Sequence, residues 1–294
     1  MSFYSQKVSI IIATACEAAR SQTLKRSIES VFNQTGIDIE LIVVVNGNKY
    51  DSKLLSYLEN DCRLCLIKIE LGNVSAARYE GLLQSSGDFF GFLDDDDEYI
   101  PGAIAKRLDI FRRCDSIDIV VTNGYESSSG VESALVYIDE EEINKDPALS
   151  FLRQNWFASP ASLFRRSSVD KATFNIDYKY FEWSYLFFLL VSQGKVFCYD
   201  NNLTYRVHAD TAQSASKSLA YDLAYPDFLK LVCRLSLSPR VIRVLDEKYI
   251  IALNASSNCY LNSGKRLLAW KMHFKCLLNG GWRYFPYTFK LIFK

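Results

Sequence analysis

The stretch DFFGFLDDDD, residues 88–97, joins an apolar segment to four consecutive aspartates. The apolar part has the length of a buried β-strand, so the aspartates follow at its carboxyl end. Adjacent carboxylates repel one another and resist burial, and the run therefore needs a cation, open solvent or protonation. The rest of the sequence decides between these possibilities.

Segments before this stretch alternate between strand and helix patterns. Apolar, β-branched runs at residues 8–12, 39–45 and 64–71 predict strands, while the patterns over 23–34 and 73–87 predict helices. Continuous apolar strands that alternate with helices indicate an α/β fold with a mainly parallel sheet, covered by helices on both faces. Ligands of such sheets bind beyond the carboxyl ends of the strands, which is where the aspartates lie.

The second half of the chain predicts more strands and then a helical region. Its apolar runs predict a buried helix at 181–195 and strands at 117–125, 134–138, 161–167, 196–200 and 203–208. Beyond Ser216 the pattern is helical, with three or four segments up to about residue 280. We therefore expect an α/β domain at residues 1–216 and a basic, aromatic-rich helical extension at 217–294.

Motifs and composition exclude several classes of protein. No G-x-G-x-x-G follows the first strand and no P-loop motif occurs, so ordinary dehydrogenases and P-loop enzymes are excluded. The C-x-x-C of Cys62 and Cys65 has no second pair or histidines beside it and is no specific sign of a zinc or redox site. The apolar run at 186–191 is far shorter than the roughly 18 residues of a membrane-spanning helix. The first residues lack the pattern of a secretory signal, and we expect a cytoplasmic protein.

Charge is unevenly distributed, although 34 Lys and Arg balance 34 Asp and Glu over the whole chain. Residues 248–294 contain eight Lys or Arg and no Asp or Glu. The ending GGWRYFPYTFKLIFK adds Trp, Tyr and Phe to these cations, which favours contact with an anionic membrane surface over nucleic acid. A solvated helical pack is the alternative. A protein that binds membrane or nucleic acid through this tail alone would leave the acidic run unexplained.

Six stretches in a fixed order resemble a known family. They are VSIIIAT, SIESVFNQT, ELIVVVNGN, NVSAARYEGLLQSSGDFFGFLDDDDEYIPGAI, FEWSYLFFLLVSQGKV and YRVHADTAQS. Over residues 7–216 the sequence resembles family 2 of the inverting glycosyltransferases, which have the Rossmann-like GT-A fold. The resemblance implies an enzyme that transfers a sugar from a nucleoside-diphosphate sugar to a hydroxyl group, with inversion at the anomeric carbon.

The resemblance assigns the acidic run to the donor and a metal ion. Asp94 matches the acid near the nucleotide ribose, and Asp96 matches the ligand of the Mn²⁺ or Mg²⁺ that holds the diphosphate. Asp95 and Asp97 are secondary, with Asp95 counted among the residues that bind the donor. Carboxylate oxygens are ligands that these hard ions prefer, and the ion would offset the repulsion within the run.

Further donor contacts are implied at the ends of the first two strands. The resemblance places the nucleotide against Ala13, Thr14 and Glu17, and then against Asn46, where many family members carry an acid. This replacement leaves the identity of the base open. Arg78 matches an arginine typical of the family, and pairing with the acidic strand end is its alternative role.

The resemblance also assigns the acceptor side. Glu182 matches the catalytic base, which removes the proton of the acceptor hydroxyl as that oxygen attacks the anomeric carbon. In the Tyr-Arg-x-His segment, Arg206 approaches the diphosphate and His208 completes the metal site. Trp156 and Trp183 are candidate platforms for sugar stacking, with packing in the core as their alternative role.

The expected reaction is transfer from a UDP-sugar, or secondly a dTDP-sugar, to a hydroxyl of a glycan or lipid-linked glycan. The family and the tail together indicate bacterial surface polysaccharide synthesis, with the enzyme peripheral on the inner face of the cell membrane. The alternative is a non-catalytic protein of the same fold that binds a sugar nucleotide or a glycan, because Val45, Asn46 and Phe181 replace usual acids. The intact acids at Asp94 and Glu182 argue against this alternative.

Overall fold

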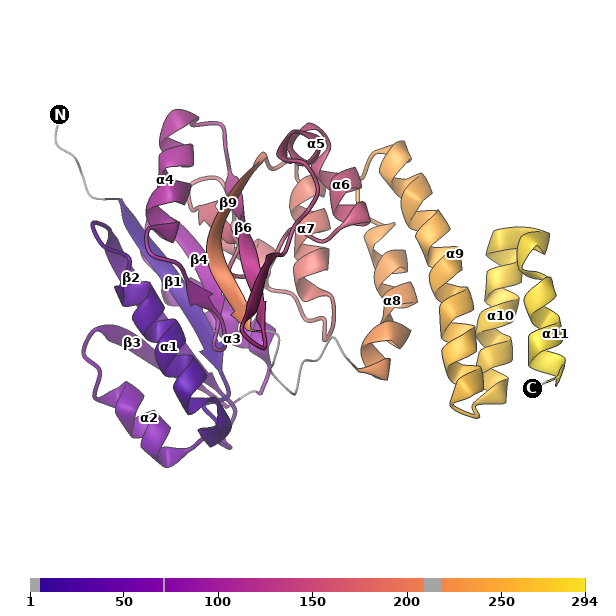
Figure 1. The fold of residues 1–294 in the computed structure, drawn as a ribbon, viewed down its shortest axis with the longest axis horizontal. Helices are drawn as coiled ribbons and strands as arrows, with labels where there is room; N and C mark the ends of the chain where they lie inside the picture. Colours follow the sequence, from indigo (N-terminus) through magenta and orange to yellow (C-terminus); the bar gives the residue numbers. More distant parts are fainter. Residues whose placement is uncertain (1–5, 71, 209–217, 294) are drawn as a thin grey trace. The chain divides into compact units, whose positions relative to one another are not determined.

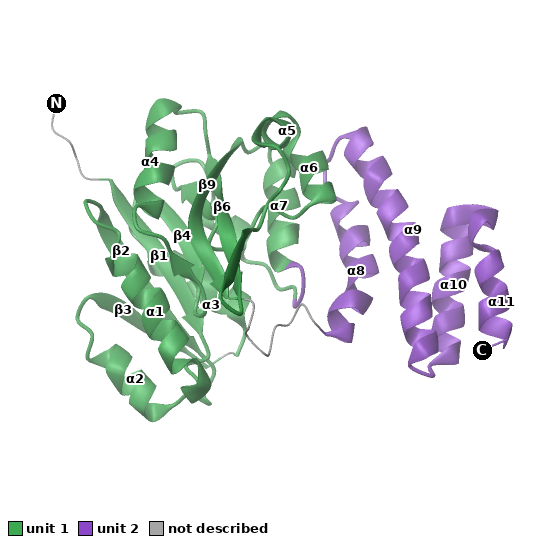
Figure 2. Cartoon of the chain, viewed as in Figure 1, with its two compact units in different colours: residues 1–178, 182–211 green, residues 179–181, 212–294 purple. Residues whose placement is uncertain are grey.

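The computed structural model describes residues 6–70, 72–208 and 218–293. The chain divides into two units, residues 1–178 with 182–211 and residues 179–181 with 212–294 (Figure 2). The predicted boundary between residues 216 and 217 lies outside the described residues, as does the end of the YRVHADTAQS stretch.

A mixed sheet lies at the centre of the first unit (Figure 1). Its strands are β1 (Lys7–Thr14), β2 (Asp38–Asn46), β3 (Leu64–Ile69), β4 (Phe89–Asp94), β5 (Glu98–Tyr99), β6 (Ile119–Ser128), β7 (Val131–Ala134), β8 (Ser162–Arg165) and β9 (Phe197–His208). Their order is β3-β2-β1-β4-β8-β6-β9-β5, with β7 beside β6. Parallel pairing joins β3, β2, β1 and β4 and also β6 with β9, and it covers most of the paired strand length. The predicted α/β fold with a mainly parallel sheet is confirmed.

The register of the first strands brings their carboxyl ends to one edge of the sheet. Ala13 of β1 lies beside Asp94 of β4, and Thr14 lies beside Val45 of β2. These segments form strands because their β-branched and aromatic side chains are buried on both faces of the sheet, as in VSIII and FFGFL. The polar residues that end the strands therefore meet at one place.

Helices connect the strands of this unit. They are α1 (Ser21–Phe32), α2 (Ser52–Glu59), α3 (Val74–Gln84), α4 (Ala103–Arg113), α5 (Glu140–Lys145), α6 (Pro147–Arg153) and α7 (Glu182–Ser192), with the 3₁₀ turns η1 (Ala18–Arg20) and η2 (Lys171–Phe174). Helix α3 begins at Asn73, whose side chain accepts hydrogen bonds from the first turn. It packs very close to the sheet at Gly81, where an added Cβ would lie 2.6 Å from Ile11 Cγ2. Small residues in the 73–87 stretch thus set the distance between α3 and β1.

Three of the predicted strands differ from the structure. The strand predicted at 134–138 is wrong beyond Ala134, because the side chain of Asn123 takes both backbone groups of Val136: its Nδ2 donates to the carbonyl at 2.9 Å and its Oδ1 accepts from the N–H at 3.1 Å. The strands predicted at 196–200 and 203–208 form one strand, β9. An irregularity in its register against β6 accommodates the polar pair between them.

The second unit is helical. It contains α8 (Leu219–Val232), α9 (Pro239–Asn262), α10 (Arg266–Gly280), the 3₁₀ turn η4 (Gly281–Tyr284) and α11 (Pro286–Phe293). The predicted helical segments up to residue 280 are confirmed. A small core of Leu261, Ala269 and Leu291 joins α9, α10 and α11. In the described part of the chain, no helix is both long and apolar enough to span a bilayer.

Candidate active site

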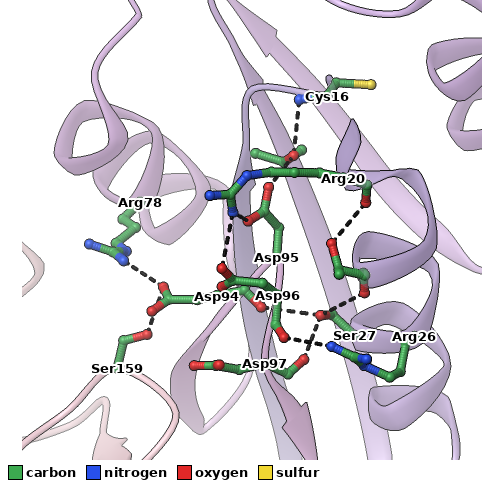
Figure 3. A network of polar contacts seen from close by, with 12 residues as sticks. Cys16, Arg20, Arg26, Ser27, Arg78, Asp94, Asp95, Asp96, Asp97 and Ser159 are labelled. Carbon is green, nitrogen blue, oxygen red and sulfur yellow. Dashed lines mark hydrogen bonds and ion pairs between the residues drawn. The ribbon is translucent and has the colours of Figure 1, made fainter. Parts of the chain in front are cut away.

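Two arginines pair with three of the four aspartates (Figure 3). From α3, Arg78 Nη2 donates to Asp94 Oδ1 at 2.6 Å. From η1, Arg20 Nη1 lies 2.5 Å from Asp95 Oδ1 and 3.3 Å from Asp96 Oδ2. These arginines therefore offset part of the negative charge of the run. The sequence alone predicted a metal ion, solvent or protonation in this role. The predicted alternative role of Arg78, pairing with the acidic strand end, is confirmed.

Asp95 is held inside the loop. Thr14 Oγ1 donates to its Oδ2 at 2.6 Å and itself accepts from the backbone N–H of Cys16 at 3.0 Å. Burial, with the nearby charge of Asp96, raises the pKa of Asp95, although Thr14 and Arg20 oppose this rise. Thr14, predicted to bind the nucleotide, thus orders the acidic run itself.

Asp97 is buried among the other carboxylates of the run, which disfavours its ionised form. Burial, followed by the charges of Asp94 and Asp96, raises its pKa well above the ordinary value, and a hydrogen bond from the backbone N–H of His208 only partly offsets this. Ser27 of α1 donates to the carbonyl of Asp97 at 2.5 Å and thereby fixes the loop. Ionisation of Asp97 is therefore disfavoured at this position.

The acid predicted to be the catalytic base lies next to the donor-side acid. Glu182 is the first residue of α7, and its Oε1 lies 3.5 Å from Arg78 Nη1. The same guanidinium holds Asp94, which also accepts a hydrogen bond from Ser159 Oγ at 2.9 Å. One arginine thus links the end of β4 with the start of α7. The backbone before Glu182 is unusual, because Phe181 has φ +60°, a left-handed value that is costly for a bulky residue.

The predicted sugar platforms fall into different environments. Trp156 is 1% exposed, and its Nε1 donates to Ser150 Oγ at 3.0 Å. The prediction that Trp156 stacks on a sugar is wrong for this structure, because the ring is enclosed by Phe151, Phe157, Phe187, Phe197 and Tyr199. Trp183 is half-buried and lies under the guanidinium of Arg78. It lines a cavity of about 30 Å³ together with Glu182, so it stays a candidate for the acceptor side.

Residues Arg206 and His208 meet at an acid that the sequence analysis did not single out. Glu98 Oε1 lies 2.7 Å from Arg206 Nη1 and 3.2 Å from His208 Nε2. Burial opposes ionisation of Glu98, but its bonds with Arg206 and His208 outweigh burial and lower its pKa. Arg206 also pairs with Glu132 at 2.5 Å. The structure thus brings both predicted residues beside the acidic run and holds them through Glu98.

The other predicted donor contacts lie around the same edge of the sheet. Ala13 is the neighbour of Asp94 in the sheet, Asn46 ends β2 beside Ile69, and Glu17 is exposed just before η1. Three polar residues at the loop were missed by the sequence analysis: Arg20, Ser159 and Arg26, whose Nη2 donates to the carbonyl of Asp96 at 2.8 Å. Each lies far from the run in the sequence and had no motif to mark it.

The carboxylate oxygens of the acidic run fit a divalent metal ion whose other ligands come from a diphosphate. Asp94 and Asp96 keep 36% and 22% of their side chains exposed, and both offer carboxylate oxygens. Within residues 6–70, 72–208 and 218–293, no three His, Cys, Asp or Glu side chains are grouped to hold a metal ion by themselves. Mg²⁺ is commonly bound by one or two carboxylates together with substrate phosphates, so the exposed oxygens of these aspartates are compatible with such an ion.

Comparison with known proteins agrees with this geometry. A family model described as "Glycosyl transferase family 2" matches residues 9–173. An uncharacterized glycosyltransferase of Rickettsia typhi is 28% identical over 77% of this chain and 73% of its own length. An uncharacterized glycosyltransferase of Rickettsia prowazekii is 32% identical, but over 42% of this chain and 37% of its own. The O-antigen biosynthesis glycosyltransferase WbnJ of Escherichia coli is 28% identical over 49% of this chain and 57% of its own.

A solved structure has the same fold. The crystal structure of S. aureus TarS 1–349 in complex with UDP-GlcNAc superposes with a TM-score of 0.64, at 14% identity, over 93% of this chain and 89% of that chain. The likeness confirms the predicted GT-A fold. The family model covers more than half of the chain. The chain therefore belongs to glycosyl transferase family 2 and is a glycosyltransferase.

Proposed function

We propose that this enzyme transfers a sugar from a UDP-sugar to a hydroxyl of a glycan or lipid-linked glycan, with a divalent metal ion. The observation that carries the proposal is the contact of Asp94 and Glu182 with the same guanidinium, that of Arg78. The first acid ends a strand at the edge where α/β sheets bind ligands, and the second begins a helix on the acceptor side. Inversion, which is general to the family, needs a base and a leaving group on opposite faces of the anomeric carbon.

The residues divide the chemistry between them. Asp96 would hold Mn²⁺ or Mg²⁺ while Asp94 lies near the nucleotide ribose, and the ion when bound would offset charge on the leaving diphosphate. Arg78 holds Glu182 in place while that carboxylate accepts the proton of the acceptor hydroxyl. His208 would have to exchange its contact with Glu98 for the metal ion in order to act as a ligand.

Relatives support the choice of donor and acceptor. S. aureus TarS, which shares the fold, has been crystallised with UDP-GlcNAc and with UDP, and we infer a UDP-sugar ahead of a dTDP-sugar. WbnJ acts in O-antigen biosynthesis, which supports a role in bacterial surface polysaccharide synthesis. An acceptor on a lipid carrier would place the enzyme on the inner face of the cell membrane as a peripheral protein.

Thermal unfolding with nucleotides tests the proposal. UDP, dTDP, GDP and CMP are added separately, with and without Mn²⁺, to the wild type and to Asp96→Asn. A ligand at ~100 times its Kd stabilises the folded protein by about 2.7 kcal/mol, which gives a clear shift in Tm. We expect a shift with UDP that requires both Mn²⁺ and Asp96. A shift with UDP but no sugar transfer to any glycan would favour the sugar-nucleotide-binding alternative, and no shift with any nucleotide would contradict the donor site.

A further inference from the structure

Helix α10 has its large apolar side chains on the outside. Leu267 and Leu278 are 88% and 86% exposed, and Phe274 is exposed between them. These residues follow the spacing of one helix face. The opposite face, which is buried, carries the small or polar residues Ala269 and His273 together with Cys276. In water the reverse arrangement is normal, because burial favours large apolar groups.

The same feature continues through η4 and α11. Trp282 in η4 is 81% exposed. In α11, Leu291 points into the core of the unit, whereas the remaining large apolar side chains are exposed. We give the name apolar tail surface to these exposed side chains of α10, η4, α11 and the residue between the last two: Leu267, Phe274, Leu278, Trp282, Phe285, Tyr287, Phe289, Ile292 and Phe293. So many exposed apolar side chains in so short a segment mark a site of interaction.

The charges around the apolar tail surface identify its partner. Its helices and turns carry exposed cations and no acid: Lys265, Arg266, Lys271, Lys275, Arg283 and Lys290. The same surface on a second copy would present the same positive charge, so charge disfavours self-association of one tail with another. Nucleic acid would satisfy the cations and leave the apolar side chains in water. An anionic bilayer satisfies both, because its headgroups attract Lys and Arg while the acyl boundary takes up apolar side chains.

We propose that α10, η4 and α11 dock on an anionic lipid surface through the apolar tail surface. Both helices are too short and too polar to cross the bilayer, and their mix of Lys, Arg, Trp and Phe is typical of helices that lie in its plane. Trp282 and Tyr287 supply the amphipathic rings that favour the headgroup level. The docking gives the proposed membrane location a defined surface. The biological role of this docking rests on the proposed function. The docking itself does not require that the enzyme transfers a sugar.

Co-sedimentation with vesicles tests this inference without any donor sugar. The full chain is mixed with vesicles of phosphatidylcholine alone or with about 30% phosphatidylglycerol, at low and high salt. We expect the protein to bind the anionic vesicles about tenfold more tightly than vesicles of phosphatidylcholine alone. Binding to the anionic vesicles should weaken as the salt concentration rises. Failure of the wild type to bind anionic vesicles overturns the inference, whatever the nucleotide assays show.

Two sets of variants locate the contact. The triple variant Leu267→Gln, Phe274→Gln, Leu278→Gln changes exposed residues, so its circular dichroism and Tm should match the wild type. Its affinity for anionic vesicles should fall by at least about tenfold. The matched control is Val131→Gln, Tyr137→Gln, which changes side chains 70% and 72% exposed in the first unit and should bind like the wild type. Equal binding by the triple variant, or loss of a dimer instead of lipid binding, overturns the inference.

Discussion

Replacement of Glu182 by glutamine separates catalysis from stability. The amide keeps the size of the side chain but cannot accept the proton of the acceptor hydroxyl. General bases contribute about 10²–10⁴-fold to rate, which corresponds to about 2.7–5.4 kcal/mol of activation free energy. The effect on folding is expected to be small, because the contact with Arg78 is long, at 3.5 Å, and Arg78 keeps its shorter bond to Asp94.

The assay is UDP release from each of a panel of UDP-sugars, with and without a lipid-linked glycan acceptor, and kcat is measured on the sugar that the wild type uses. For Glu182→Gln we expect kcat to fall by at least about 100-fold while the Kd of UDP, measured by calorimetry, stays within about threefold. Glu80→Gln on α3 is the matched control, since Glu80 pairs with Gln84 on the helix surface, and it should leave kcat unchanged. A kcat for Glu182→Gln within about threefold of the wild type would refute the assignment of the base.

Three further predictions concern stability, each measured by thermal or urea unfolding. Asp97→Asn should stabilise the protein more at about pH 8 than at about pH 5, because a raised folded-state pKa costs stability as pH rises; an equal effect at both values would contradict this. Glu40→Gln should cost roughly 3 kcal/mol at neutral pH and little near pH 2, because burial is outweighed by bonds from Lys7, Ser86 and Ser9 that lower the pKa of Glu40 from 4.5 to about 2. A pH-independent loss would disprove that assignment. Gly81→Ala should cost about 1–3 kcal/mol through its clash with Ile11, and unchanged stability would show that α3 can shift.

The sequence predicted the long elements of the fold because each carries its own signal. Buried strands such as β1 and β2 are continuous β-branched runs, and α1 repeats its apolar residues at helical spacing. Short elements lacked that signal. Strand β5 has two residues, and the irregular backbone at Val136 is held by the side chain of Asn123, thirteen residues away. Helices α5 and α6 do begin at capping aspartates, Asp139 and Asp146, which a search for helix starts would have found.

The aspartates of the candidate site and two of its arginines, Arg78 and Arg206, were predicted from the sequence, whereas Arg20 and Arg26 were not. The run at Asp94–Asp97 is visible as a motif, and the resemblance to the family located Glu182 and His208. The positions of Arg20 and Ser159 beside the run result from chain packing over long sequence separations, which no local pattern encodes. The error at Trp156 has the same origin, because the composition of its stretch does not distinguish a core aromatic ring from one at a binding surface.

A crystal soaked with Mn²⁺ and UDP and measured for anomalous scattering of manganese tests whether the acidic run holds the donor through a metal ion. We expect one manganese peak at bonding distance from a carboxylate oxygen of Asp96, with the diphosphate of UDP as its other ligand and the nucleotide at the carboxyl ends of β1 and β2. UDP bound away from this edge of the sheet, or bound here with no manganese at Asp96, would show that the run is not this donor site.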